Sequence, residues 1–175
     1  MFKAEMKFNV NKALLLPLLM VLAAVLVSPA FASQNRHENR EHGFSFNYPE
    51  AWIEMPPIGS ASAVGASPVS NFATNFNVVI TEPQGASALT ERDISDFFRS
   101  IFTNWELRSF RRGSLLGEDV AIIDHRFSQG EFELRLRQYL VDHGRRGYTL
   151  TFTALESRFH YYEDDFAVIV NSFRF

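Results

Sequence analysis

Three closely spaced segments with strand-like alternation restrict the fold more than any other feature of this sequence. They cover residues 120–128, 131–142 and 148–154, and only short turns separate them. Connections of this length can join antiparallel neighbours, whereas parallel strands need a crossover of a dozen residues or more. The sequence therefore predicts an antiparallel β-meander in the second half of the chain.

The charged residues of the first two segments favour one register. A two-residue turn at Gln129-Gly130 makes both cross-strand charge pairs opposite in sign, which stabilises a sheet. The predicted pairs are Phe127 with Phe132, Asp124 with Arg135, Arg126 with Glu133, His125 with Leu134 and Ile123 with Leu136; a loop at 143–147 then places Leu150 beside Leu140 and Phe152 beside Gln138. One face of this sheet is apolar and includes His125. The other is predicted to be polar, with Asp124, Arg126, Glu133, Arg135, Arg137, Tyr139, Thr149, Thr151 and Thr153.

Two segments have the periodicity of amphipathic helices. In residues 89–105, six apolar residues recur at helical spacing: Ile94, Phe97, Phe98, Ile101, Phe102 and Trp105. Thr90 and Asp93 resemble a capping box at its start. Residues 158–171 form a second candidate helix, with Ser157 as its N-cap. The predicted fold class is α+β: an antiparallel sheet with two long amphipathic helices packed against it.

The rest of the chain divides into short strands and a long loop. Strands are predicted at 44–48, 52–55 and 76–81, and residues 172–175 again alternate with period two. Residues 56–73 carry no charge and are rich in Pro, Gly, Ser and Ala, which predicts a long loop.

The first 32 residues have the three-part pattern of a secretory signal peptide. Three lysines precede an apolar run at 13–27, and Ala30-Phe31-Ala32 supplies a small-x-small cleavage site. The alternative is an uncleaved anchor, but this run makes about 22 Å of helix, short of the roughly 30 Å of a bilayer core. We expect cleavage after Ala32, a flexible leader at 33–42, a single domain at 43–175 and a periplasmic or extracellular location.

Composition excludes several classes of protein. The chain has no cysteine, so disulfides, thiol catalysis and a lipoprotein cysteine are excluded. After cleavage, 14 arginines face 19 acidic residues, and this mild negative charge does not favour nucleic-acid binding.

The ordered motifs resemble one known family. The motif Phe44-x-Phe46-x-Tyr48-Pro49-x-x-Trp52 precedes a strand and an aromatic helix, and a meander and a helix ending in Asn171-Ser172-Phe173 follow. This order is similar to that of the PsbP-like superfamily, which includes the DcrB-like bacterial envelope proteins and a Ran-binding Mog-type branch. The resemblance covers nearly all of residues 43–175. It implies an α/β sandwich, an accessory or assembly role at membrane complexes, and usually no enzymatic activity.

No residue pattern indicates a catalytic or metal site. His37 and His42 are about 140° apart on a helix, so one helix face does not present both to a metal ion. His160 and Asp164 have ligand spacing but fit an exposed helix start, and His125 is expected in the core. We therefore expect no cofactor, no metal and no enzymatic activity.

The leading hypothesis is a non-catalytic accessory protein that binds a protein partner in the cell envelope. Its candidate surface is Arg135, Arg137 and Tyr139, because the predicted register places Arg137 opposite Ile122 and leaves it without a facing carboxylate. The first alternative is a small-ligand carrier with a pocket near Trp52 and the loop at 56–73. A hydrolase built around His125 is a remote third hypothesis.

Overall fold

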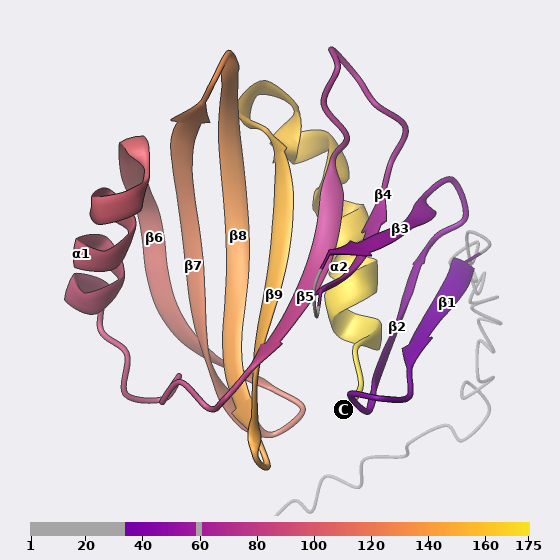
Figure 1. Ribbon diagram of the computed structural model, residues 1–175, viewed down its shortest axis with the longest axis vertical. Helices are drawn as coiled ribbons and strands as arrows, with labels where there is room; N and C mark the ends of the chain where they lie inside the picture. The colour runs from indigo at the N-terminus through magenta and orange to yellow at the C-terminus, as the bar shows by residue number, and fades with distance from the viewer. Residues whose placement is uncertain (1–33, 59–60) are drawn as a thin grey trace, which may run out of the picture. The chain divides into compact units, whose positions relative to one another are not determined.

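A seven-stranded antiparallel sheet dominates the fold. The computed structural model describes residues 34–58 and 61–175 (Figure 1), so the predicted signal peptide lies outside the described residues. The elements are β1 (Gln34–Asn39), β2 (Phe44–Pro49), β3 (Ile53–Ile58), β4 (Ala61–Gly65), β5 (Asn75–Thr81), α1 (Glu91–Ile101), β6 (Thr103–Leu115), β7 (Glu118–Gln129), β8 (Phe132–His143), β9 (Arg146–Leu155), the 3₁₀ helix η1 (Glu156–Tyr162) and α2 (Glu163–Ser172). The strand order is β3-β4-β5-β9-β8-β7-β6, and β1 and β2 form a separate hairpin.

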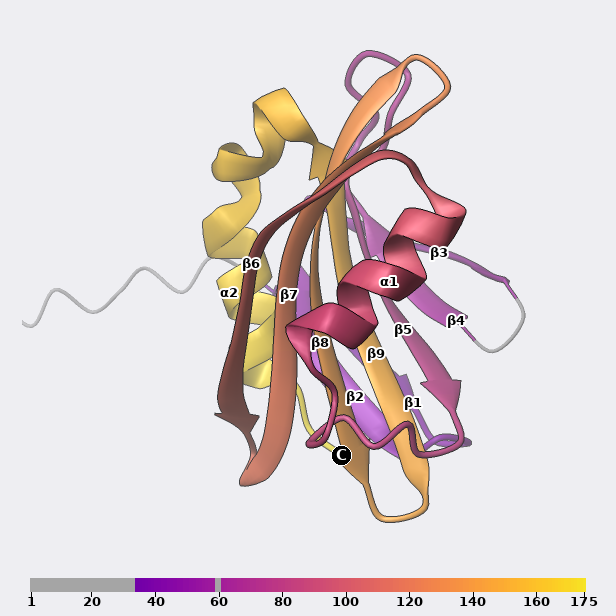
Figure 2. The same ribbon diagram turned by 90° about the vertical axis from the view of Figure 1, so that its left-hand side faces the viewer.

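Both faces of the large sheet are covered, by different elements. Figure 2 shows α1 and α2 on opposite sides of it. On the α2 face, Phe152 of β9 contacts Phe166 of α2, and Phe76 of β5 contacts Phe46 of β2. On the α1 face, Phe98 stacks on His125 of β7. The architecture is thus α+β with helices on an antiparallel sheet, as predicted.

The main core lies on the α2 face and is rich in aromatic side chains. Phe46, Phe76, Phe152, Phe159 and Phe173 are all fully buried there. Burial of each contributes roughly 1.5–3 kcal/mol relative to exposure. Two smaller clusters lie on the α1 face, one around Ile94, Phe98 and Ile123 and the other around Phe127 and Leu134.

The two helices are shorter than predicted. The Thr90–Asp93 capping box is confirmed, but α1 ends at Ile101 because Phe102 is extended, with φ −112° and ψ 139°. The second predicted helix is divided into η1 and α2, neither of which exceeds ten residues. The expectation of two long amphipathic helices is therefore not confirmed.

Three segments form strands that the sequence analysis did not predict. The predicted leader at 33–42 contains β1, which pairs with β2 along its whole length. The predicted loop at 56–73 contains the end of β3 and all of β4. β6 lies at the edge of the sheet and exposes most of its side chains, so its sequence has no regular apolar alternation.

The predicted register of the meander was wrong, because both of its turns lie elsewhere. Gln129 pairs with Phe132, so the turn is Gly130-Glu131 and the β7–β8 register is displaced by two residues. His143 pairs with Arg146, so the next turn is Gly144-Arg145 and the β8–β9 register is displaced by one. Gly130 and Gly144 have φ of 61° and 59°, the left-handed conformation that glycine adopts without strain.

The one-residue displacement changes which side chains share a face. Arg135, Arg137 and Tyr139 lie on the α2 face, beside Leu150 and Phe152 of β9. The three threonines of β9, Thr149, Thr151 and Thr153, lie on the opposite face with α1. The predicted polar face combining the β8 arginines with these threonines does not exist.

Candidate functional site

Two of the three residues predicted to bind a partner, Arg135 and Arg137, lie beneath η1. Arg135 and Arg137 both contact Asp124 of β7, at 2.8 and 3.0 Å, and Arg137 also pairs with Glu163 of α2 at 3.1 Å. Both guanidinium groups lie over the ring of Phe159, 4.2 and 5.1 Å from its centroid. The expectation that Arg137 lacks a carboxylate partner is therefore wrong.

This cluster is mostly buried and its charges are compensated internally. The side chains of Arg135 and Arg137 are 19% and 20% exposed, and that of Asp124 is 6% exposed. Burial by itself raises the pKa of Asp124, but the hydrogen bonds and charges of the two arginines outweigh it and lower the pKa below its usual value. Tyr139 packs edge-on against Phe152. The geometry thus gives the arginines a structural role, and partner binding by the three residues stays a prediction.

His125 is a buried histidine with both ring nitrogens hydrogen-bonded. The indole N–H of Trp105 donates to Nδ1 at 2.9 Å, and an indole can only donate, so the ring proton is on Nε2. Nε2 then donates to Oε1 of Gln138 at 3.2 Å, and Nε2 of Gln138 donates to Thr151 at 3.1 Å. Burial lowers the pKa of His125 to about 4, against the opposing effects of Gln138 and Asp124. His125 is a core residue held neutral.

The other histidines have no arrangement typical of a metal site. His37 lies in β1 with Nδ1 2.9 Å from Glu54, and its ring stacks on Phe46. His160 is exposed and stacks on Tyr161. His143 pairs with Glu118 and stacks on Phe175. Within residues 34–58 and 61–175, no group of three His, Asp or Glu residues is placed to hold a metal ion.

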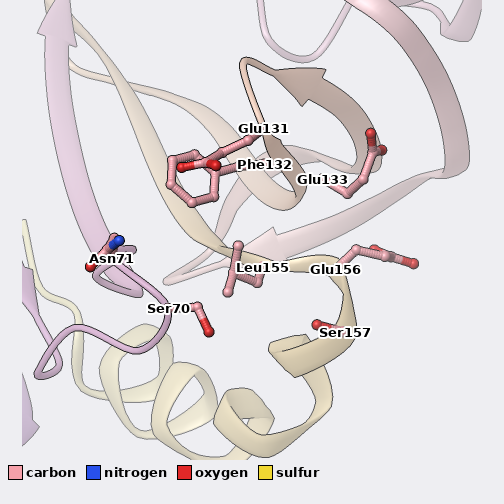
Figure 3. A pocket seen from close by; sticks show the side chains of 8 residues that line it. All are labelled: Ser70, Asn71, Glu131, Phe132, Glu133, Leu155, Glu156 and Ser157. Atoms are coloured by element: carbon pink, nitrogen blue, oxygen red, sulfur yellow. The ribbon is translucent and has the colours of Figure 1, made fainter.

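Two hollows in the surface are candidate binding sites, and the first is acidic. We call it the acidic cleft; it has a volume of about 630 Å³ and is lined by Ser70, Asn71, Glu131, Phe132, Glu133, Leu155, Glu156 and Ser157. Figure 3 shows that these residues come from the β7–β8 turn and the start of β8, the β9–η1 junction and the segment before β5. Three carboxylates and no basic side chain line it.

The three carboxylates of the acidic cleft differ in how many hydrogen-bond and ion-pair partners they have. Glu156 Oε1 pairs with Arg108, but Glu156 Oε2 is buried and has no hydrogen-bonding partner among the described residues. Glu133 accepts a hydrogen bond from Ser128, at 2.6 Å, and Glu131 takes part in none of the ion pairs of the described residues. Phe132 and Leu155 belong to an apolar cluster, so the acidic cleft combines apolar surface with negative charge.

The loop at 56–73, which the sequence analysis associated with a pocket, contributes Ser70 and Asn71 to this cleft. Trp52, its other predicted wall, lies elsewhere. Its side chain is buried in the main core, and Nε1 donates to Asp165 of α2 at 3.2 Å.

The second hollow lies between α1 and the sheet. We call it the α1 hollow; it measures about 400 Å³ and is lined by Gln84, Leu89, Asp93, Ile94, Phe97, Phe98, Gln138, Leu140 and Thr149. Phe97, which lines it, and Ile101, four residues further along α1, are 58% and 55% exposed. Both residues were predicted to lie in a buried stripe, but the apolar stripe of α1 is wider than the face that the helix buries, so this site was not predicted.

Comparison with solved structures identifies the fold. Cyanobacterial PsbP (CyanoP) from Synechocystis sp. PCC 6803 superposes with a TM-score of 0.62 at 18% identity, over 82% of this chain and 92% of that chain. LpqN of Mycobacterium tuberculosis, described as involved in cell envelope biogenesis, gives a TM-score of 0.61 at 12% identity, over 81% and 89%. Neither a protein-family model nor a curated protein matches the sequence. The chain therefore has the PsbP-like fold, as its motifs indicated.

Proposed function

We propose that this chain is a non-catalytic accessory protein outside the cytoplasm that binds a protein partner of the cell envelope. Three observations support the proposal: the predicted signal peptide at 1–32, the PsbP-like fold, and the similarity to LpqN, a protein involved in cell envelope biogenesis. No helix in the described part of the chain is long and apolar enough to cross a membrane.

The acidic cleft is the observation that carries the binding proposal. An arginine or lysine side chain of the partner can lay its aliphatic stem on Phe132 and Leu155 and direct its charge to Glu131 and Glu133. Glu156 adds negative charge to the lining, although its Oε1 pairs with Arg108 and its Oε2 is buried away from the surface. The proposed occupant is therefore a basic side chain on the surface of an envelope protein.

Capture of partners from envelope membranes tests this proposal. The charge-neutralising variant Glu131→Gln/Glu133→Gln should capture the partner about tenfold less than the unmodified protein, or weaker still. A desolvated ion pair at an interface typically contributes about 2 kcal/mol or more. The control is Glu41→Gln/Glu50→Gln, which makes the same change of charge at two exposed residues far from the cleft in sequence. It should capture the partner like the unmodified protein.

The salt dependence of capture provides an independent measurement. Capture should weaken as ionic strength rises from 0.05 to about 0.3 M, because salt screens the charges of the cleft. Equal capture by the cleft variant and the control would overturn the assignment of this site. Capture that increases with salt would argue for an apolar contact instead.

A small-ligand carrier remains the second candidate function, because the cleft volume of about 630 Å³ falls in the range of small-molecule sites. Because three carboxylates line the cleft, the ligand of such a carrier is a small organic cation. Thermal-shift measurement with arginine methyl ester and with agmatine separates the two functions. The carrier function is favoured if one of these compounds raises the melting temperature saturably, if Glu131→Gln removes this effect, and if no protein partner is captured.

A further inference from the structure

The α1 hollow has a fixed hydrogen-bond donor at its base. Because Trp105 forces the ring proton of His125 onto Nε2, the carbonyl oxygen of Gln138 must face His125. The amide nitrogen of Gln138 then points to the other side, where one N–H donates to Thr151. The second N–H has no partner among the hydrogen bonds of the described residues, and Gln138 lines the hollow. The sheet therefore presents an oriented amide donor.

The remainder of the lining is apolar or uncharged apart from one residue. Leu89, Ile94, Phe97, Phe98 and Leu140 supply the apolar walls. Thr149 also lines the hollow, and its hydroxyl adds a second donor.

The one charge in the lining belongs to Asp93, whose Oδ2 takes part in the cap of α1. The Asp93 carboxylate accepts hydrogen bonds from the backbone N–H and hydroxyl of Thr90, and these bonds lower the Asp93 pKa. No basic side chain lines the hollow, so it offers no counter-ion to an anionic ligand.

We propose that the α1 hollow binds a small neutral ligand with an apolar body and a carbonyl group. The carbonyl oxygen accepts from Gln138 Nε2 and from the Thr149 hydroxyl, and the apolar body lies between Phe97, Ile94 and Leu140. A volume of about 400 Å³ suits a ligand of two or three fused or linked rings, or a short acyl chain. This site is separate from the acidic cleft and does not depend on the proposed function.

The probe for this proposal is prodan, a neutral naphthyl ketone whose fluorescence reports both apolar surroundings and hydrogen bonding to its carbonyl. The matched probe is 2-dimethylaminonaphthalene, which lacks the ketone. The purified protein should bind prodan saturably, with micromolar affinity. Thr149→Val should weaken prodan binding by about three- to tenfold, the effect of one neutral hydrogen bond, and leave the ketone-free probe unaffected. Phe97→Ala should weaken binding of both probes by about tenfold.

Thr153→Val is the control, because Thr153 lies on the same strand and the same face but does not line the hollow. It should bind both probes like the unmodified protein. Gln138 is left unchanged, since its substitution also removes a partner of His125. Phe97 is 58% exposed, so its replacement should leave the melting temperature nearly unchanged. The proposal is overturned if prodan does not bind saturably, or if Phe97→Ala and Thr149→Val bind it as tightly as Thr153→Val does.

Discussion

At the scale of single residues, His125 shows how the fold determines a protonation state. Its two partners, Trp105 and Gln138, leave no place for a second ring proton, and burial lowers its pKa to about 4. The unfolded chain, with a histidine pKa of about 6.5, binds protons more tightly. Stability from His125 is therefore complete above pH 6.5 and is lost as pH falls from 6.5 towards 4.

This difference predicts the effect of replacing His125. Between pH 8 and pH 5 the unmodified protein should lose about 2 kcal/mol of unfolding free energy through this group. His125→Leu should be less stable at pH 8, because Trp105 and Gln138 lose a partner, but it should lack this loss at lower pH. Urea denaturation at the two pH values measures both effects, with His160→Leu as an exposed control. An unchanged acid-side loss in His125→Leu would refute the buried neutral state.

Arg137 is the residue at which sequence and structure differ most. Because it shares the buried Asp124 with Arg135, Arg137→Ala should lower the free energy of unfolding by about 1–3 kcal/mol. Arg145→Ala, in an exposed turn, should change it by less than about 0.5 kcal/mol. Chemical denaturation at pH 7 gives both values. If Arg137→Ala has the stability of Arg145→Ala, the arginine is free for the binding role predicted from the sequence.

The sequence located His125 correctly and Arg137 incorrectly for one physical reason. Alternation along a strand does not depend on the turn, so the face of His125 relative to its own strand was predictable. The partner of Arg137 depends on register, which the turn determines. Opposite charges at Asp124 and Arg135 favoured a turn at Gln129-Gly130, whereas in the structure Gln129 pairs with Phe132 and Gly130, with a positive φ, is the first turn residue. Two-residue turns accept a glycine of positive φ at either position, so the glycine alone does not distinguish the two registers.

At the scale of elements, the sequence predicted the start of α1 correctly but placed its end too far along the chain. Its start follows from local chemistry, since Thr90 and Asp93 satisfy each other's backbone N–H groups. Its end does not, because Phe102 and Trp105 continue the helical spacing but pack on Phe127 and His125 as part of an extended chain. Tertiary contacts with β7 thus outweigh helix periodicity.

The capping box predicts a measurable contribution to stability. Thr90→Ala should lower the unfolding free energy by about 1 kcal/mol, because the N–H of Asp93 loses its acceptor. Arg92→Ala serves as the control in the same helical turn, since its pair with Asp96 is exposed and contributes little. Guanidinium denaturation compares the two variants. Equal stability of Thr90→Ala and Arg92→Ala would mean that the first turn of α1 is frayed in solution.

At the scale of the whole molecule, the sheet differs from the predicted one in having two buried faces. The prediction of one polar face came from the arginines and threonines of β8 and β9, which were placed together by the wrong register. In the structure the polar residues of each face are compensated locally, by Asp124 on the α2 face and by the His125–Gln138–Thr151 chain on the α1 face. Buried polar groups require such partners, but single-strand patterns do not identify them.

The position of β1 sharpens the prediction about processing of the chain. The proposed cleavage after Ala32 leaves one residue, Ser33, before β1, whose first residue is Gln34. β1 contributes the pairing with β2, the Arg36–Ser45 hydrogen bond and the stacking of His37 on Phe46. Cleavage should therefore occur before Gln34, and N-terminal sequencing of the protein from the extracytoplasmic fraction should find Ser33 first.

Removal of β1 tests the structural side of the same prediction. A protein that begins at Arg40 should be less stable by roughly 2–4 kcal/mol than one that begins at Ser33, because Phe46 and Phe44 lose the strand that covers them and the hydrogen bonds of β2 become unpaired. Thermal unfolding of the two forms measures the difference. If both melt at the same temperature, residues 33–39 behave as part of the flexible leader that the sequence predicted at 33–42. If sequencing instead finds Met1 intact on membrane-bound protein, the predicted cleavage after Ala32 is wrong and residues 1–32 act as an uncleaved anchor.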